Sequence, residues 1–238
     1  IRRRFRVGVS RLLVTRALAA HAGVEETTIA QRLIGYTHIG AAPDAQAYAA
    51  LVAADEGGLA SPGHPYPFFL AQQLNAPVAT LGDPRDWMVE WKWDGIRAQL
   101  VARDGEAWLW SRGEDLVTER FPELHALGLA LPRGTVIDGE VVVWRDGRVQ
   151  PFAELQTRIG RKTLSAKFLA ARPVALVAYD LLEIDGADQR PRVQVERRAA
   201  LEALVAAVGH PALKLSPLVE RPSWDAYATL RAESRARG

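Results

Sequence analysis

Residues 90–111 read EWKWDGIRAQLVARDGEAWLWS, and this stretch indicates the fold class. Two runs rich in aliphatic and aromatic residues, Ile96–Ala102 and Ala107–Ser111, are separated by Asp104-Gly105. An Asp-Gly pair between two such runs is typical of a tight β-hairpin turn, because both residues tolerate a positive φ. The stretch therefore predicts two antiparallel strands.

The same pattern continues on both sides of this hairpin. Further β-type runs are Trp87–Lys92, Thr135–Trp144 and Val174–Leu182. Four more Asp-Gly pairs lie at residues 94–95, 138–139, 146–147 and 185–186, where hairpin turns are expected. Helical segments interleave near Phe121–Leu127, near Val195–Val208 and from Ser223 onward. Hairpins mixed with helices predict an α+β fold, with antiparallel sheets flanked by helices.

The N-terminal residues have a different character. Apolar residues recur at helical spacing at Val9, Leu12, Leu13 and Ala17, and again at Tyr48, Leu51 and Val52 after the expected N-cap Asp44. Residues 56–67 contain three prolines and three glycines, which disfavour helix and strand. We therefore expect an all-α segment over residues 1–55, a connection over 56–76 and an α+β domain over 77–238.

Composition narrows the classes of protein. The 238 residues include no cysteine, which excludes disulfides and cysteine-ligated zinc. There is no apolar run of about 18 residues and no signal peptide, so the sequence predicts a cytoplasmic protein without a membrane partner. The first 24 residues carry six arginines and no acid. This block fits either a surface for phosphate backbones or a solvated helix face.

The charged residues around Lys92 form the strongest candidate for a reactive site. In a strand, Glu90, Lys92 and Asp94 would share one face, with Trp91 and Trp93 on the other. A lysine needs help to act as a nucleophile, because it is almost fully protonated at neutral pH. By itself, this pattern fits a surface ladder of ion pairs better than a reactive site.

The sequence Lys-x-Asp-Gly-x-Arg at residues 92–97 resembles the nucleotidyl-transfer motif of ATP-dependent DNA ligases, RNA ligases and mRNA capping enzymes. Three further segments resemble later motifs of these families in the same order: Trp110-Ser111-Arg112-Gly113, Asp138-Gly139-Glu140 and Tyr179-Asp180. The resemblance implies a ligase-type adenylation domain, in which a lysine carries the nucleotide as a phosphoramidate.

The resemblance also implies a role for each matched residue. Lys92 would attack the α-phosphate of ATP, Arg112 and Glu140 would hold the ribose, and Tyr179 would stack on adenine. Glu140 would also support Mg²⁺, and Arg97 would contact the nucleotide or the nick phosphate.

Glu90 is placed with the nucleotide-binding residues because it accompanies Lys92. Each of the other assignments has a simpler alternative. Arg112 would pair with Glu114 or Asp115, Glu140 would be exposed beside a hairpin turn, and Tyr179 would be a half-buried strand aromatic.

Features outside the shared motifs favour a DNA ligase over its relatives. We expect such a ligase to act as a monomer on nicked double-stranded DNA. Phe152–Gln156 and Arg158–Lys162 are similar to a stretch of bacterial and archaeal DNA ligases, and Val7–Ser10 resembles the end of their helical DNA-binding domain. If residues 7–10 end such a domain, the six arginines within residues 1–24 would contact the DNA backbone. The alternatives are an RNA ligase, a capping-type nucleotidyltransferase or an inactive DNA-binding fragment.

One departure from the family pattern affects the expected activity. The Glu-Gly-x-x-x-Lys motif, the Lys-x-Lys motif and the OB-fold domain that follow in these ligases are absent from the sequence. We therefore expect a truncated adenylation domain that binds nucleotide weakly and adenylates itself inefficiently.

Overall fold

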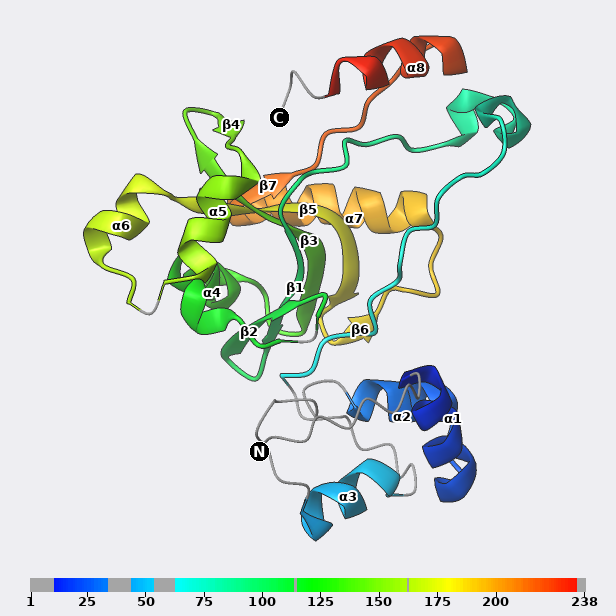
Figure 1. Cartoon of the computed structure of the whole chain (residues 1–238), viewed down its shortest axis with the longest axis vertical. Coiled ribbons are helices and arrows are strands. Elements are labelled where there is room, and N and C mark those ends of the chain that lie inside the picture. The colour runs from blue at the N-terminus through cyan, green and yellow to red at the C-terminus, as the bar shows by residue number, and fades with distance from the viewer. Residues whose placement is uncertain (1–10, 34–43, 54–62, 114, 162, 235–238) are drawn as a thin grey trace, which may run out of the picture. The chain divides into compact units, whose positions relative to one another are not determined.

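The computed structural model describes residues 11–33, 44–53, 63–113, 115–161 and 163–234. The chain forms two compact units, residues 1–67 and residues 68–238, each of which is described by itself (Figure 1). The predicted α+β class is confirmed by the second unit, where a sheet is flanked by helices. The described residues of the first unit contain helices and no strand.

The first unit has three short helices: α1 (Arg11–Ala22), α2 (Glu26–Arg32) and α3 (Ala45–Val52). The predicted N-cap is confirmed, because the Asp44 carboxylate accepts a hydrogen bond of 2.7 Å from the Ala47 N–H. Val9 lies outside the described residues. A small apolar cluster joins the three helices through Ala19, Ile29, Leu33 and Leu51. Leu51 is buried but Leu13 is exposed, so the spacing predicted both helices correctly but identified only some of the side chains that pack.

The second unit contains the remaining elements. Its strands are β1 (Ile96–Arg103), β2 (Glu106–Ser111), β3 (Thr135–Arg145), β4 (Arg148–Val149), β5 (Val174–Ile184), β6 (Ala187–Asp188) and β7 (Leu213–Leu215). Its α-helices are α4 (Pro122–Ala130), α5 (Phe152–Ile159), α6 (Ala166–Ala171), α7 (Gln194–Val208) and α8 (Trp224–Ala232). Its 3₁₀ turns are η1 (Val78–Leu81), η2 (Pro84–Asp86) and η3 (Thr118–Arg120).

The seven strands form one sheet in the order β2-β1-β3-β5-β6, with β4 paired to β3 and β7 paired to β5. Every pair is antiparallel except β5–β7, which is parallel and was not predicted. The hairpin turns at Asp104-Gly105, Asp146-Gly147 and Asp185-Gly186 are confirmed. Both residues of each turn have a positive φ, which matches the twist of the strands they connect.

The prediction of hairpin turns at the other two Asp-Gly pairs is wrong. Asp138-Gly139 lies inside β3, where Gly139 pairs with β1 on one side and β5 on the other. Asp94-Gly95 forms a bend immediately before β1. At both places a glycine allows the backbone of a neighbouring strand to come close, so the same dipeptide serves packing and not a turn.

The predicted strand Trp87–Lys92 is also wrong. The 3₁₀ turn η2 (Pro84–Asp86) ends immediately before this segment. Within the segment only Glu90 forms a β-bridge, and its partner is Leu218. Isolated pairing does not build a ladder, so the segment that carries Lys92 is extended but is not a strand of the sheet.

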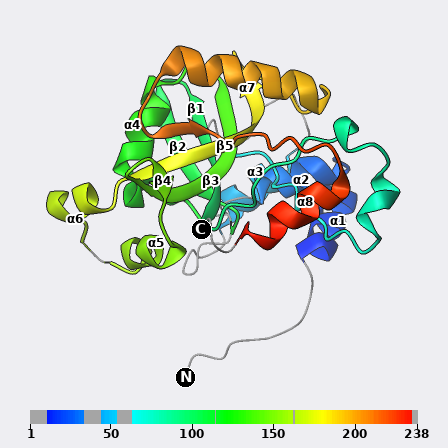
Figure 2. The same cartoon turned by 90° about the horizontal axis from the view of Figure 1, so that it is seen from above.

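One face of the sheet packs against helices α4 and α7. Figure 2 shows α7 running along this face, beside β5. The apolar core includes side chains of both helices and of four strands: Leu124, Leu127, Leu201, Leu204, Ala98, Leu100, Leu109, Ile137, Val141, Leu176 and Leu181. Because side chains alternate along strands, residues between these core positions point to the opposite face of the sheet.

Changing Gly139 to alanine is expected to destabilise the second unit by about 1–3 kcal/mol. An added Cβ would lie 2.7 Å from the Val177 carbonyl oxygen, and a carbonyl in the sheet cannot move away easily. Gly160→Ala is the matched control, because its nearest neighbour would be the Gln156 carbonyl oxygen at 3.7 Å. Urea denaturation of the two variants would test this, and equal free energies of unfolding would contradict it.

Candidate functional site

Lys92 is exposed on the extended segment that precedes β1. The predicted alternation of exposed and buried side chains is present over residues 91–94, although this segment is not a regular strand. Lys92 and Asp94 are exposed, whereas Trp91, Trp93 and Glu90 are half-buried. The lysine is therefore open to a ligand, and the side chains around it are held by the protein.

Glu140 on β3 lies beside this segment. Its carboxylate accepts a hydrogen bond from the backbone N–H of Gly95 and interacts electrostatically with Lys92. A Cβ at residue 95 would lie 2.3 Å from the Val141 carbonyl oxygen, so only glycine permits this approach. The glycine of Lys-x-Asp-Gly-x-Arg thus brings the lysine segment against β3.

Arg97 is surrounded by protein groups. Its guanidinium binds both oxygens of the Asp138 carboxylate, at 3.1 and 2.8 Å, and donates to the Phe69 carbonyl. The rings of Phe68 and Tyr179 lie 5.6 and 5.9 Å from the guanidinium carbon. The Tyr179 hydroxyl donates to the same aspartate at 3.2 Å. These contacts fix the orientation of both the arginine and the tyrosine ring.

Asp138 was not predicted as a site residue by itself. It lies within the Asp-Gly-Glu motif, inside an otherwise apolar β run. A carboxylate in such a run is rarely buried without a partner, and this was the sequence signal that could have identified Asp138. The side chain is 5% exposed and links residues of β1, β3 and β5. It therefore organises the face on which Glu140 and Tyr179 lie.

Arg112 follows β2 and is exposed. Its backbone N–H donates to the Arg97 carbonyl at 2.9 Å, which places the two predicted arginines on adjacent segments. Among the described residues, its side chain forms no ion pair, so the expected alternative with Asp115 is not found. The other alternative, Glu114, lies outside the described residues.

Glu90 is held by two residues that no pattern in the sequence connects with it. Arg198 of α7 donates to its carboxylate at 2.7 Å, and the Ser216 side chain also forms a hydrogen bond with it. Burial raises the pKa of Glu90 to about 7, against the opposing effect of the Arg198 charge. Neither Arg198 nor Ser216 belongs to a recognisable motif, so only the tertiary structure identifies them.

Burial changes the protonation of the central groups. It raises the pKa of Glu140 to about 7, although Lys92 and the Gly95 N–H act in the opposite direction. Burial also raises the pKa of Asp138, which Arg97 opposes, and the pKa of Tyr179. The tyrosine is therefore a neutral hydrogen-bond donor throughout the physiological range.

The raised pKa of Glu140 predicts a pH-dependent stability. Folding tightens proton binding here, so this group stabilises the fold below about pH 4 and loses that contribution as pH rises toward 7. The free energy of unfolding of Glu140→Gln, measured relative to that of the wild type, should therefore rise between pH 5 and pH 8. The expected rise is on the order of 1 kcal/mol after discounting for solvent screening. Thermal unfolding of both proteins at the two pH values measures this. Identical pH dependence would contradict it.

Glu140 is also the predicted metal ligand. Among the described residues, no group of three or more histidine, cysteine, aspartate or glutamate side chains is placed to hold a metal. Mg²⁺ commonly keeps several waters and uses one or two carboxylates together with substrate phosphates. A single carboxylate beside an exposed lysine fits that kind of site and does not fit a metal cage built by protein alone.

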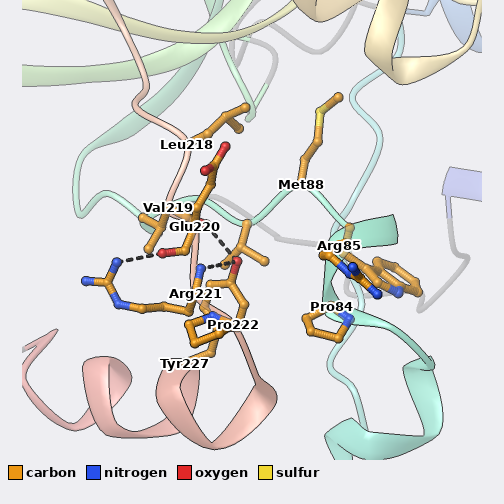
Figure 3. Close-up of a pocket in the computed structure, with 11 residues that line it drawn as sticks. Pro84, Arg85, Met88, Leu218, Val219, Glu220, Arg221, Pro222 and Tyr227 are labelled. Carbon is orange, nitrogen blue, oxygen red and sulfur yellow. Dashed lines mark hydrogen bonds between the residues drawn. The ribbon is translucent and has the colours of Figure 1, made fainter.

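A separate cavity of about 580 Å³ lies beside the segment that leads to Lys92 (Figure 3). Its lining comes from Pro84, Arg85 and residues 87–89, from residues 218–222 and from Tyr227 of α8. Figure 3 shows Pro84, Arg85 and Met88 facing the 218–222 segment across it. None of the predicted site residues lines this cavity, so the candidate site is the surface around Lys92 and Glu140.

The family model and the curated relatives agree on one family. A family model described as an ATP-dependent DNA ligase domain matches residues 68–230. A probable DNA ligase of Opitutus terrae is 48% identical over 122 residues, which cover 51% of this chain and 12% of that protein. DNA ligase C2 of Mycolicibacterium smegmatis is 40% identical over 136 residues, which cover 56% of this chain and 38% of that protein. A solved mycobacterial DNA ligase D with ATP and MES is 31% identical, covers 63% of this chain and 44% of that chain, and has a TM-score of 0.48.

The chain spans 12% of the length of the Opitutus terrae protein and 38% of the length of the Mycolicibacterium smegmatis protein. In the described part of the chain, no helix has the length and apolar character required to cross a membrane.

Proposed function

This chain belongs to the family of ATP-dependent DNA ligase domains, and from that premise we propose that it carries the catalytic core of an enzyme that seals nicks in duplex DNA. Lys92 takes AMP from ATP in this proposal. One observation carries it: residues that are distant in sequence converge around the exposed lysine. Glu140 binds the Gly95 N–H, and Arg97 and Tyr179 both bind Asp138.

The proposed reaction has three steps. The neutral amine of Lys92 attacks the α-phosphorus of ATP, so that an N–P bond forms while the bond to pyrophosphate breaks. AMP then passes from the lysine to the 5′-phosphate at the nick. Finally the 3′-hydroxyl attacks that phosphate and AMP leaves. The exposure of Lys92 supports the first step, because the nitrogen must reach a phosphate from solvent.

The nucleotide contacts follow from the placement of the other residues. Tyr179 stacks on adenine, with its ring orientation fixed by the bond to Asp138. Glu140 and Arg112 bind the ribose. Glu90 lies at the edge of the nucleotide site and orients the segment that carries Lys92. We assign Arg97 first to holding Asp138 and Tyr179, with a phosphate contact as its second role, because its guanidinium already has partners.

Glu140 is also the residue that would hold Mg²⁺. When bound, the ion would neutralise negative charge that develops on the phosphates. The ionised carboxylate is the form that binds a cation, so the raised pKa of Glu140 confines metal binding to pH values above about 7.

The remaining parts of the proposal concern the whole protein. Residues 1–55 would be the end of a helical DNA-binding domain, residues 56–76 a connection and residues 77–238 the adenylation domain. The protein would act as a monomer in the cytoplasm. The match of the family model to residues 68–230 supports the placement of the adenylation domain.

The test is to incubate the protein with α-labelled ATP and Mg²⁺, separate it under denaturing conditions and map the label by peptide mass spectrometry. Two forms are needed: the 238-residue chain and the chain extended through the expected C-terminal motifs and OB-fold domain. Label on Lys92 of the extended form would support the proposal. No label on either folded form would overturn it and favour a DNA-binding module.

The same assay separates the related enzymes. ATP, GTP and NAD are compared as donors, and nicked DNA and RNA as acceptors. A preference for GTP would indicate a capping-type enzyme, and sealing restricted to RNA would indicate an RNA ligase.

A further inference from the structure

The segment that carries Lys92 needs support from outside the sheet. Its backbone is joined to the rest of the unit by the Glu90–Leu218 bridge and by a hydrogen bond of 2.8 Å from the Val219 N–H to the Val89 carbonyl. Both contacts lie before the lysine, and a third, from the Gly95 N–H to the Glu140 carboxylate, lies three residues after it. The position of Lys92 therefore depends on how the side chains beside it are held.

Arg198 supplies one of these contacts from α7. It is 5% exposed and donates to the Glu90 carboxylate at 2.7 Å, to the Ser216 carbonyl at 2.8 Å and to Glu202 at 2.7 Å. Glu90 lies 108 residues earlier in the chain. One buried guanidinium thus joins helix α7, the lysine segment and the residue that follows β7.

Ser216 supplies contacts on both sides of the lysine. It is fully buried, and its own N–H is fixed by a hydrogen bond of 2.8 Å to the Ala178 carbonyl of β5. Its side chain forms a hydrogen bond with Glu90 and accepts another from the Trp93 indole N–H at 3.1 Å. Glu90 lies two residues before Lys92, and Trp93 lies one residue after it.

We propose that Arg198 and Ser216 are positioning residues for Lys92. They hold Glu90 and Trp93 against β5 and α7, so that the lysine between them projects in one direction. Neither residue contacts the reacting atoms. The inference rests on the proposed function, since it concerns the lysine that takes AMP.

The burial of Arg198 argues against a purely stabilising role. Helix α7 is already packed by Leu201 and Leu204, and removing a guanidinium from water is unfavourable. Well-packed apolar residues often stabilise such a position at least as well as a buried ion pair. Its other partner, Glu202, is one helical turn away and half exposed, so that pair does not require burial. The contacts to Glu90 and Ser216 are the ones that need a buried arginine.

The experiment compares Arg198→Met and Arg198→Lys with the wild type, in the form of the protein that takes label. The first measurement is the single-turnover rate of Lys92 adenylation as a function of ATP concentration. The second is the sealing of a nick already carrying a 5′-adenylate, a step that does not use Lys92. We expect Arg198→Met to lower the adenylation rate at saturating ATP by about tenfold or more, because a misplaced reacting atom is strongly penalised. Sealing of the adenylated nick should stay within about twofold of the wild type.

Three variants separate positioning from folding. Arg198→Lys should restore part of the rate, since it keeps a cation near Glu90. Arg103→Gln is the matched control: it breaks another buried ion pair of the same unit, between Arg103 of β1 and Glu183 of β5, and should leave the adenylation rate unchanged. If Arg198→Met fails to fold, Ser216→Ala removes only the hydroxyl and should lower the rate by about fivefold.

The outcomes are distinguishable. An unlabelled wild type would overturn both the proposed function and this inference. A labelled wild type with an unchanged Arg198→Met rate would overturn only the inference. Equal losses in adenylation and in sealing of the adenylated nick would also overturn it, because they would indicate a general structural defect.

Discussion

Lys92→Ala is expected to abolish covalent uptake of AMP, with a loss of at least about 10⁴-fold in the rate of adenylation. No other group can take the place of the amine, because the phosphoramidate bond forms on its nitrogen. Lys92→Arg should be equally inactive, since a guanidinium keeps the charge but remains protonated. The measurement is retention of α-labelled AMP after denaturing separation.

Lys167→Ala is the matched control, because Lys167 is another exposed lysine, located on α6. It should take up label at the wild-type rate. The Lys92 variants should still seal a nick that already carries a 5′-adenylate, which would show that they fold and bind DNA. Label retained by Lys92→Ala would place the nucleophile elsewhere and would contradict the proposed site.

Arg158→Ala is expected to destabilise the second unit by about 3 kcal/mol, at the lower end for a broken buried ion pair. The Arg158 side chain is fully buried and binds the Glu123 carboxylate, at 2.8 Å through one nitrogen. It also donates to the Arg120 and Arg172 carbonyls, at 2.9 and 3.2 Å. Removal leaves these groups without their donor. Glu123 is 28% exposed and regains some water, which limits the effect.

Thermal and urea unfolding test this prediction, and a loss of this size corresponds to a melting temperature lower by roughly 6–12 °C. Arg192→Ala serves as the control, because its pair with Glu196 is about half exposed and should contribute less than about 1 kcal/mol. The double variant Arg158→Met with Glu123→Leu should recover much of the loss, since no unpaired charge remains. Equal stability of Arg158→Ala and Arg192→Ala would contradict the assignment.

Arg158 also shows how a sequence resemblance acquires a physical meaning. The segment Phe152–Gln156 and Arg158–Lys162 was recognised only as similar to DNA ligases. In the structure it forms α5, and its arginine connects this helix to the start of α4 and to the end of α6. Lys162 lies outside the described residues. The buried Arg158 therefore contributes to the stability of the fold and is not available for a contact with DNA.

Local patterns in the sequence predicted the regular elements of the second unit well. The four long strands, helices α4, α7 and α8 and three hairpin turns were found because alternation, helical spacing and Asp-Gly turns depend on neighbouring residues. The error at Trp87–Lys92 has the opposite cause. Its composition suits a strand, but a strand also needs a partner, and the fold provides only one bridge.

The sequence by itself determined the fold class, the family resemblance and the set of candidate residues around Lys92. Only the tertiary structure decided which of them meet and what holds them. Asp138 joins Arg97 and Tyr179, and Arg198 and Ser216 fasten the two sides of the lysine segment. These contacts join residues 41 to 123 positions apart, and no local pattern encodes them. They exist because the sheet and α7 bring those residues together as the core packs.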